Sequence, residues 1–322
     1  MSEFELIARH FAGHDAAQGV VLGVGDDAAV LSVPAGQELV VATDTIVAGT
    51  HFPEVTPPDA IGWRALAVNL SDLAAMAAEP HWALLALTLP EADDDWLTAF
   101  ARGFFTLAVA HDVALIGGDT TRGPLAVTVT LHGTVPAGRA IRRAGAAAGD
   151  RIFVTGTLGD AAAGLAVLQG RLVAPEAHAA HLRERFLRPQ PRNALAGVLR
   201  AHVSAAIDIS DGLLADLGHV LAASGVGARL AVDRLPLSEA LLAACGQAVA
   251  REFALGGGDD YELCVVVPAA RAAAFEAAAG EAGVAVTDIG MIESAPGLRC
   301  VDARGEEIVP PRRGYDHFGD SP

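Results

Sequence analysis

The sequence predicts a mixed α/β or α+β protein of two domains, on three observations. Its 322 residues are enough for one large domain or two ordinary ones. With 52% hydrophobic and 19% charged residues, a sizeable core can be buried. Short apolar runs alternate with longer helix-like segments in both halves. Composition changes over residues 137–150, and we place the boundary near residue 138, giving domains 1–138 and 139–322.

The expected elements of the first half follow from start signals and periodicity. Ser2 and Glu5 have capping-box spacing and open a short helix. Pro57-Pro58-Asp59 begins a long helix that runs to about residue 78, and Pro90 followed by three aspartates begins another. Apolar runs between turn residues predict strands at 20–22, 28–33, 39–42, 82–89 and 113–116, and the alternation over 125–135 predicts a long antiparallel strand.

The second half repeats the strand and helix rhythm, which extends the mixed class to the whole chain. Strands are expected at residues 151–155, 204–209 and 261–267. Helices are expected at residues 159–169, 176–188, 192–202 and 269–282, with a further helix starting at Gly212.

The charge of the chain excludes several classes of protein. The formal net charge is −17, and all 22 basic residues are arginines, because the sequence contains no lysine. Chemistry that needs a lysine is therefore excluded, including P-loop phosphate binding, the protein-kinase strand lysine and Schiff-base formation. The acidic balance also argues against a nucleic-acid partner, which would require a basic face.

The cysteines and the N-terminus predict a cytoplasmic protein. Cys245, Cys264 and Cys300 are scattered and odd in number, which disfavours a disulfide framework or a thiolate metal site. The N-terminus is acidic where a signal peptide would be basic, and no apolar run is long enough to span a membrane.

Short acidic segments carry the chemistry of the sequence. In four of them an apolar run ends and an aspartate follows beside glycine, serine or threonine, as ligand sites do at the ends of strands in open α/β sheets. These aspartates are Asp27, Asp44, Asp119 and Asp208. Asp72 differs, since it lies in an expected helix with Asn69 and Ser71, and residues 257–261 (GGDDY) form a possible sixth segment.

Taken singly, each acidic segment is explained by a turn or a helix cap. Together they predict divalent cations, because converging buried carboxylates repel one another unless a cation lies between them. Carboxylates and hydroxyls are the hard oxygen ligands that suit Mg²⁺, and several such ions imply a polyphosphate. Arg142 and Arg143 are the arginine candidates for neutralising it, with a solvated linker pair as the alternative.

The acidic segments and their neighbours resemble the thiamine-monophosphate kinase family over nearly the whole chain, from about residue 23 to 315. The motifs GGDT and DISDGL are shared more widely, with aminoimidazole ribonucleotide synthetase and its relatives, whereas the second and third segments are specific to the kinases. The similar segments are residues 23–30 (GVGDDAAV), 43–52 (TDTIVAGTHF), 67–76 (AVNLSDLAAM), 117–121 (GGDTT), 154–160 (VTGTLGD), 207–213 (IDISDGL) and 257–263 (GGDDYEL).

The resemblance implies a fold, an activity and a partner. The fold is the two-domain aminoimidazole ribonucleotide synthetase-like fold, with an N-terminal α/β domain that dimerises with its twin and a C-terminal α/β domain that completes the active site. The activity is ATP-dependent phosphorylation of thiamine monophosphate to thiamine diphosphate, with several Mg²⁺ ions bound. Because the acceptor is a phosphate monoester, largely ionised at pH 7, direct in-line transfer needs no general base.

The resemblance also implies roles for individual residues. The expected magnesium ligands are Asp27, Thr43, Asp44, Asp72, Asp119, Asp208 and Asp211, and among them Asp44, Asp72, Asp119 and Asp208 are assigned to catalysis. The expected ATP contacts are Gly118, Asp119, Arg143 and Ser210. The expected contacts to thiamine monophosphate are His51, Asp259 and Tyr315, for which capping or packing is the alternative.

Two departures and two rival readings accompany this prediction. The family commonly has glutamate where this chain has Asp259, and often serine where it has Ala42, which puts one substrate contact and one metal contact in doubt. The rivals are another ATP-using enzyme of the same superfamily, such as an aminoimidazole ribonucleotide synthetase, and a non-catalytic nucleotide- or metal-binding relative. An assay for thiamine diphosphate and ADP discriminates between all of these readings.

Overall fold

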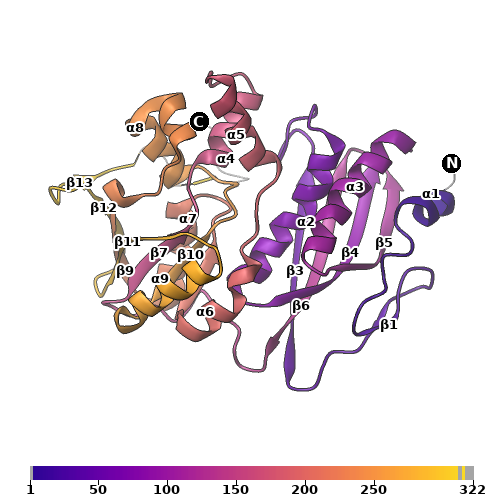
Figure 1. Ribbon diagram of the computed structural model, residues 1–322, viewed down its shortest axis with the longest axis horizontal. Helices are drawn as coiled ribbons and strands as arrows, with labels where there is room; N and C mark the ends of the chain where they lie inside the picture. Colours follow the sequence, from indigo (N-terminus) through magenta and orange to yellow (C-terminus); the bar gives the residue numbers. More distant parts are fainter. Residues whose placement is uncertain (1–2, 311–313, 316–322) are drawn as a thin grey trace. The chain divides into compact units, whose positions relative to one another are not determined.

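The computed structural model describes residues 3–310, Gly314 and Tyr315 (Figure 1). Its residue contacts divide the chain into two compact units. Unit 1 consists of Met1–Leu73 and Ala78–Ala140, and unit 2 of Ala74–Ala77 and Ile141–Pro322. The first helix, α1 (Glu3–His10), is where the capping box expects it, although Ser2 lies outside the described residues.

Unit 1 is built on a four-stranded sheet with the strand order β3-β6-β4-β5. The strands are β3 (Gln37–Val47), β4 (Glu79–Leu89), β5 (Ala114–Arg122) and β6 (Ala126–Pro136). β6 pairs antiparallel with both β3 and β4, while β4 and β5 are parallel. The helices α2 (Pro58–Ala75) and α3 (Asp94–Ala110) lie across one face of this sheet (Figure 1).

The two faces of the unit 1 sheet differ in burial. Along β6, Val127, Val129 and Leu131 are buried on one face, as expected for the face that packs against helices. Leu39 and Val41 of β3 are about half exposed, at 45% and 52%, and lie on the other face. A hairpin of β1 (Val20–Leu22) and β2 (Val30–Leu31) packs against Trp82, Ala114 and Ile116 with its apolar side chains.

Unit 2 is built on a seven-stranded sheet with the order β13-β12-β9-β11-β7-β10-β8. Its pairings are antiparallel except for that of β12 with β9. The strands are β7 (Arg151–Thr155), β8 (Ala205–Asp208), β9 (Gly227–Ala231), β10 (Leu263–Val267), β11 (Val286–Glu293), β12 (Gly297–Val301) and β13 (Glu307–Ile308).

Helices cover this sheet so that its central strands are buried on both faces. Ile152 and Val154 of β7 belong to one hydrophobic cluster, and Phe153 between them belongs to another. Strands buried on both faces read as continuous apolar runs, which explains the sequence LCVVV of β10. The helices are α4 (Asp160–Leu168), α5 (Glu176–Leu187), α6 (Ala196–His202), α7 (Leu213–Ser224), α8 (Glu239–Gly256) and α9 (Ala272–Glu281), with short 3-10 turns at Asn193–Leu195, Val232–Arg234 and Ala269–Arg271.

The predicted fold class is confirmed, whereas the expected setting of two aspartates is wrong. β3 and β5 continue past the predicted ends at residues 42 and 116, so Asp44 and Asp119 lie inside strands. Residues 43–47 continue β3 in register with β6, and residues 117–122 continue β5 in register with β4. The elements α8, β9 and β11 to β13 were not predicted, and within the described residues no helix is long and apolar enough to cross a membrane.

Candidate active site

Thr43 and Asp44 stand in the middle of β3, each opposite a residue of β6. Thr43 faces Thr130, and the two hydroxyl groups are hydrogen-bonded at 3.0 Å, while Thr43 Oγ1 also donates to Val129 O at 3.2 Å. Asp44 faces the buried Val129 and is itself half-buried. Because successive side chains of a strand point to opposite faces, Thr43 and Asp44 are directed to different faces of the sheet.

Gly118 and Asp119 lie on β5, at the opposite edge of the same sheet. Asp119 is exposed and lies opposite Ala86 of β4. Two strands separate β5 from β3, which puts the backbones of Asp44 and Asp119 about 14 Å apart at the usual strand spacing. This separation favours more than one bound ion over a single ion shared by both carboxylates.

The other expected residues of unit 1 lie on a turn, a helix and a loop. Asp27 is exposed in the turn between β1 and β2, where its N–H donates to Asp26 Oδ1 at 2.8 Å. Asp72 is half-buried near the C-terminal end of α2. His51 follows β3, and its Nδ1 accepts the N–H of Val47 at 3.0 Å. With Nδ1 as the acceptor, the neutral ring carries its proton on Nε2, which suits it to donate to a phosphate oxygen.

In unit 2 the expected residues gather around residues 208–212, which we call the acidic turn. Asp208 is the last residue of β8 and is 6% exposed, as the strand-end rule predicts. Ser210 and Asp211 are half-buried, and Gly212 caps α7. Three consecutive N–H groups of this turn, those of Ser210, Asp211 and Gly212, donate to a single oxygen of Asp216 in α7.

The carboxyl group of Asp216 is buried and lies near the carboxylates of Asp208 and Asp211. Burial and, to a smaller extent, the neighbouring carboxylates of Asp208 and Asp211 together raise the pKa of Asp216 to about 7, against the effect of the N–H groups that it accepts. Carboxylates that repel one another in this way form a cation-seeking environment.

The second loop of unit 2 is residues 257–262, which we call the glycine-aspartate segment. Asp259 and Tyr261 both have positive φ, 70° and 49°, a region that non-glycine residues seldom occupy. The segment runs beside the acidic turn, because the N–H of Asp259 donates to Ser210 O and that of Tyr261 to Ile209 O. Gly258 permits this approach, since a Cβ there would overlap Ser210 O. The N–H of Tyr315 donates to Asp211 O, so the third expected substrate contact also reaches this turn.

Buried charges hold the glycine-aspartate segment in place. Glu262 is fully buried and accepts hydrogen bonds from Arg185, Arg192 and the Thr155 hydroxyl at 2.5–2.7 Å. Burial alone would raise the pKa of Glu262, but the two guanidinium groups outweigh it and the pKa is lowered. Gly156, at φ 57°, leaves the space that the Glu262 carboxylate fills.

Asp260 is the second buried anchor of this segment. It is 1% exposed and accepts the N–H groups of Gly159 and Ala161 at the start of α4, at 2.7 and 3.3 Å. Burial raises the pKa of Asp260 to about 8, in spite of those N–H groups and Arg185. Two buried side chains therefore alternate with Asp259 and Tyr261 and can sustain their strained backbone.

Arg143 lies in the segment that leads into β7. Its side chain is exposed, and its carbonyl oxygen accepts the hydroxyl of Ser224, the last residue of α7, at 3.2 Å. The preceding Arg142 accepts the N–H of Ala206 in β8 through its carbonyl oxygen. The backbone of the arginine pair is therefore fixed beside β8 and α7, the two elements that flank the acidic turn.

The donor set suits Mg²⁺ in chemical type, since it consists of carboxylates and hydroxyl groups. Among residues 3–310 and the described pair 314–315, no group of three or more His, Cys, Asp or Glu side chains is placed to hold an ion. Mg²⁺ usually takes one or two carboxylates and completes its shell with substrate phosphates and water. A pair of carboxylates such as Asp208 and Asp211 matches this usual coordination of Mg²⁺.

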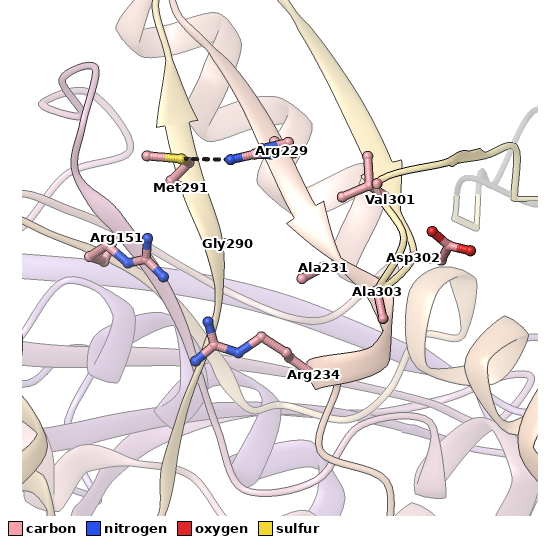
Figure 2. A pocket seen from close by; sticks show the side chains of 10 residues that line it. Arg151, Arg229, Ala231, Arg234, Gly290, Met291, Val301, Asp302 and Ala303 are labelled. Atoms are coloured by element: carbon pink, nitrogen blue, oxygen red, sulfur yellow. Dashed lines mark hydrogen bonds between the residues drawn. The ribbon is translucent and has the colours of Figure 1, made fainter.

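A pocket of about 330 Å³ lies elsewhere in unit 2 and contains none of the expected site residues. Figure 2 shows Arg151, Arg229 and Arg234 around it. Arg151 and Arg234 are both paired with Asp288, and Arg229 is paired with Glu293. We interpret these arginines as ion pairs on a sheet surface, because each already has a carboxylate partner.

Asp216, Asp260 and Glu262 were not singled out from the sequence. The available signal was a carboxylate in a strongly apolar setting, such as Asp216 inside LLADLGHVL and Glu262 directly before LCVVV. A charge at such a position is buried and must be hydrogen-bonded. The distant partners of Glu262, on α5 and at Arg192, have no signal in the sequence.

Comparison with known proteins assigns the chain to a family. The model of the AIR synthase related protein N-terminal domain matches residues 25–135, and that of the C-terminal domain matches residues 147–303. The chain is 52% identical over 320 residues to the thiamine-monophosphate kinase of Salmonella typhimurium, which covers 98% of each chain.

Solved structures give the same result. The thiamine-monophosphate kinase of Stenotrophomonas maltophilia is similar with a TM-score of 0.85 and 49% identity, covering 95% of this chain and 96% of that one. AaThiL complexed with AMPPCP and TMP is similar with a TM-score of 0.79 and 32% identity, covering 89% of each chain. The chain therefore belongs to the AIR synthase related family and, within it, to the thiamine-monophosphate kinases.

Proposed function

We propose that this protein phosphorylates thiamine monophosphate to thiamine diphosphate with ATP as the phosphoryl donor. The observation that carries the proposal is the 52% identity, over nearly the full length of both chains, to a thiamine-monophosphate kinase. The similarity to AaThiL complexed with AMPPCP and TMP supports an ATP-like nucleotide and thiamine monophosphate as the two substrates.

The chemistry of the acceptor explains why the site is rich in carboxylates and needs no catalytic base. A phosphate monoester has a second pKa of about 6, so its attacking oxygen is largely ionised at neutral pH. The obstacle is the repulsion between two anionic substrates. When bound, Mg²⁺ would neutralise charge on the phosphates and align them for direct in-line transfer.

Within this proposal the residues have distinct tasks. The seven expected magnesium ligands supply hard oxygen atoms: Asp27, Thr43, Asp44, Asp72 and Asp119 from unit 1, and Asp208 and Asp211 from unit 2. Gly118, Asp119, Arg143 and Ser210 bind ATP. His51 donates from Nε2 to the phosphate of the acceptor, while Asp259 and Tyr315 contact its thiamine portion.

The test is turnover by the purified chain with ATP, Mg²⁺ and thiamine monophosphate. We expect thiamine diphosphate and ADP in equal amounts, and no turnover after chelation of Mg²⁺. Formation of AMP, or no product, would reject the activity. Incubation with γ-labelled ATP alone tests the direct transfer, because label retained on the protein would indicate a phosphoenzyme instead.

The protein is further proposed to act as a homodimer in the cytoplasm, where ATP is available. The support for a dimer is the half-exposed apolar face of unit 1, where Leu39 and Val41 of β3 stand beside Thr43 and Thr45. We expect light scattering to give twice the mass of the 32.9 kDa chain. Val41→Asp should yield a monomer, and an unchanged mass would exclude this face as the interface.

A further inference from the structure

A carboxylate of the protein occupies the place where a helix N-terminus ordinarily binds an anion. The N–H groups of Ser210, Asp211 and Gly212 donate to Asp216 Oδ2 at 3.0, 3.1 and 3.0 Å. Asp216 lies in the first turn of α7 and is 2% exposed. Successive N–H groups before a helix commonly cradle a phosphate. Here they are already used, so a nucleotide phosphate at this turn must be neutralised by other groups.

The same three peptide groups present their carbonyl oxygens to Tyr261, Asp259 and Tyr315, and the last two of these residues are expected to bind the acceptor. A peptide group is planar, so the C=O of one residue and the N–H of the next turn together. Each of these peptide groups therefore donates its N–H to Asp216 and accepts a second hydrogen bond at its carbonyl oxygen. Ile209 O accepts from Tyr261 N (2.9 Å), Ser210 O from Asp259 N (2.8 Å) and Asp211 O from Tyr315 N (2.9 Å).

We propose that Asp216 is a positioning residue, whose single oxygen orients three successive peptide planes and thereby aligns Ser210 and Asp211 with Asp259 and Tyr315. The proposal rests on the proposed function, because it is the expected roles of those four residues that give the alignment its purpose. Asp216 itself touches neither substrate. It acts through the acidic turn, which links the expected nucleotide contacts to the expected acceptor contacts.

Geometry and charge can be separated by substitution at this one position. Asp216→Asn keeps an oxygen that can accept all three N–H groups, whereas Asp216→Leu keeps the approximate size and accepts none. The matched control is Asp93→Ala in unit 1, because Asp93 also collects backbone N–H groups with one oxygen, those of Asp95 and Trp96 at the start of α3. That control weakens a helix start without touching the expected site.

The experiment measures kcat, the KM for each substrate, and the calorimetric Kd of AMPPCP in the presence of Mg²⁺. For Asp216→Leu we expect kcat to fall about 100-fold, and the KM for thiamine monophosphate and the Kd of AMPPCP to rise about tenfold each, since a displacement of about 1 Å has effects of this size. Asp216→Asn should stay within about fivefold of the wild type in all of them, and Asp93→Ala within about twofold.

Several results would overturn the proposal. They are an Asp216→Leu variant that is folded and kinetically close to the wild type, an Asp216→Asn variant as impaired as Asp216→Leu, or an equal kinetic loss in Asp93→Ala. If Asp216→Leu does not fold, Asp216→Glu replaces it, because the extra methylene displaces the accepting oxygen and the same loss is expected. A wild-type protein that makes no thiamine diphosphate would reject the proposed function, while AMPPCP binding would still test Asp216.

Discussion

The two units hold their expected ligands in different ways. In unit 1 they lie on accessible elements: Asp27 is exposed on a turn, Asp119 is exposed on an edge strand, and Asp44 is half-buried on the other edge strand. In unit 2 they lie on the acidic turn, which the buried carboxylate of Asp216 fixes, beside the glycine-aspartate segment, which the buried carboxylate of Glu262 fixes. We therefore expect the loops of unit 2 to be positioned before a ligand binds, which would reduce the ordering cost on binding.

Carboxylates of like charge are thus held in two ways in this protein. A regular sheet fixes the positions of carboxylates through its strands, and solvent screens them until a cation binds. A loop has no such ladder and needs buried partners to keep its shape. We consequently expect substitutions of the expected ligands in unit 1 to lower activity without lowering stability. In unit 2, substitutions of the buried partners should lower both.

Asp44→Asn should have the largest effect on catalysis. A bound cation supplies several kcal/mol of charge stabilisation in the transition state, and each 1.4 kcal/mol is tenfold in rate, so kcat should fall at least about 100-fold. Thermal stability should stay the same or rise slightly, because a half-buried charge has been removed. Kinetics and thermal unfolding measure the two effects, with the exposed Asp112→Asn of the same unit as the control. Near-normal turnover at ordinary Mg²⁺ would argue against a metal role.

Glu262→Gln should have the largest effect on stability. It leaves Arg185 and Arg192 beside a neutral side chain in a buried network, and breaking such a pair costs about 3–5 kcal/mol. Urea unfolding measures the loss. The matched control is Glu293→Gln, whose partners Arg229 and Arg299 are about half exposed, and there the expected cost is about 1 kcal/mol or less. Equal losses of unfolding free energy in both variants would show that the buried ion pairs of Glu262 stabilise the fold no more than the exposed ion pairs of Glu293.

The acidic motifs could be recognised from the sequence, but the secondary structure around each aspartate was predicted correctly only in part. Asp208 is where an apolar run suggested, at the end of a strand, because β8 is a short, fully buried strand. Asp44 and Asp119 were misplaced because threonine-rich strand sequences resemble turns, and the pairing that extends β3 over Thr43 to Val47 is supplied by β6, some 80 residues away. Long-range partners of this kind decide the setting of a residue and leave no local signal.

The anchors were missed for a related reason. Asp216 bonds to residues four to six positions earlier, so its spacing was visible, yet the same spacing fits an ordinary residue of a helix surface. The role of Glu262 depends on Arg185 and Arg192, which lie about 70 residues or more earlier and on other elements. Only the three-dimensional fold shows that these charges meet.

Acid should weaken unit 2 through Glu262 in a defined pH range. The pKa of Glu262 is lowered from its ordinary value of 4.5 in the folded protein, so its ion pairs stabilise the fold fully above that value. The contribution is lost as the pH falls from about 4.5 towards the folded-state pKa. The difference in unfolding free energy between the wild type and Glu262→Gln should therefore be constant from about pH 8 to 5.5 and shrink below about pH 4.5. A difference that grows on acidification would contradict the assigned ion pairs.

Asp259→Glu should have the smallest effect and tests the departure of this chain from its family pattern. The backbone at residue 259 has φ 70°, a left-handed conformation in which aspartate is enriched among non-glycine residues. Glutamate lacks that local preference, so we expect a loss of a few tenths of a kcal/mol in unfolding free energy. Because Asp260 and Glu262 hold the segment from both sides of Tyr261, the longer carboxylate should still reach the acceptor, and the KM for thiamine monophosphate should change by no more than about threefold.

Asp260→Asn, which alters a buried side chain that holds the segment instead, provides the comparison. A larger change in KM for Asp259→Glu than for Asp260→Asn would show that the side chain at 259, and not the anchored backbone, sets acceptor binding in unit 2.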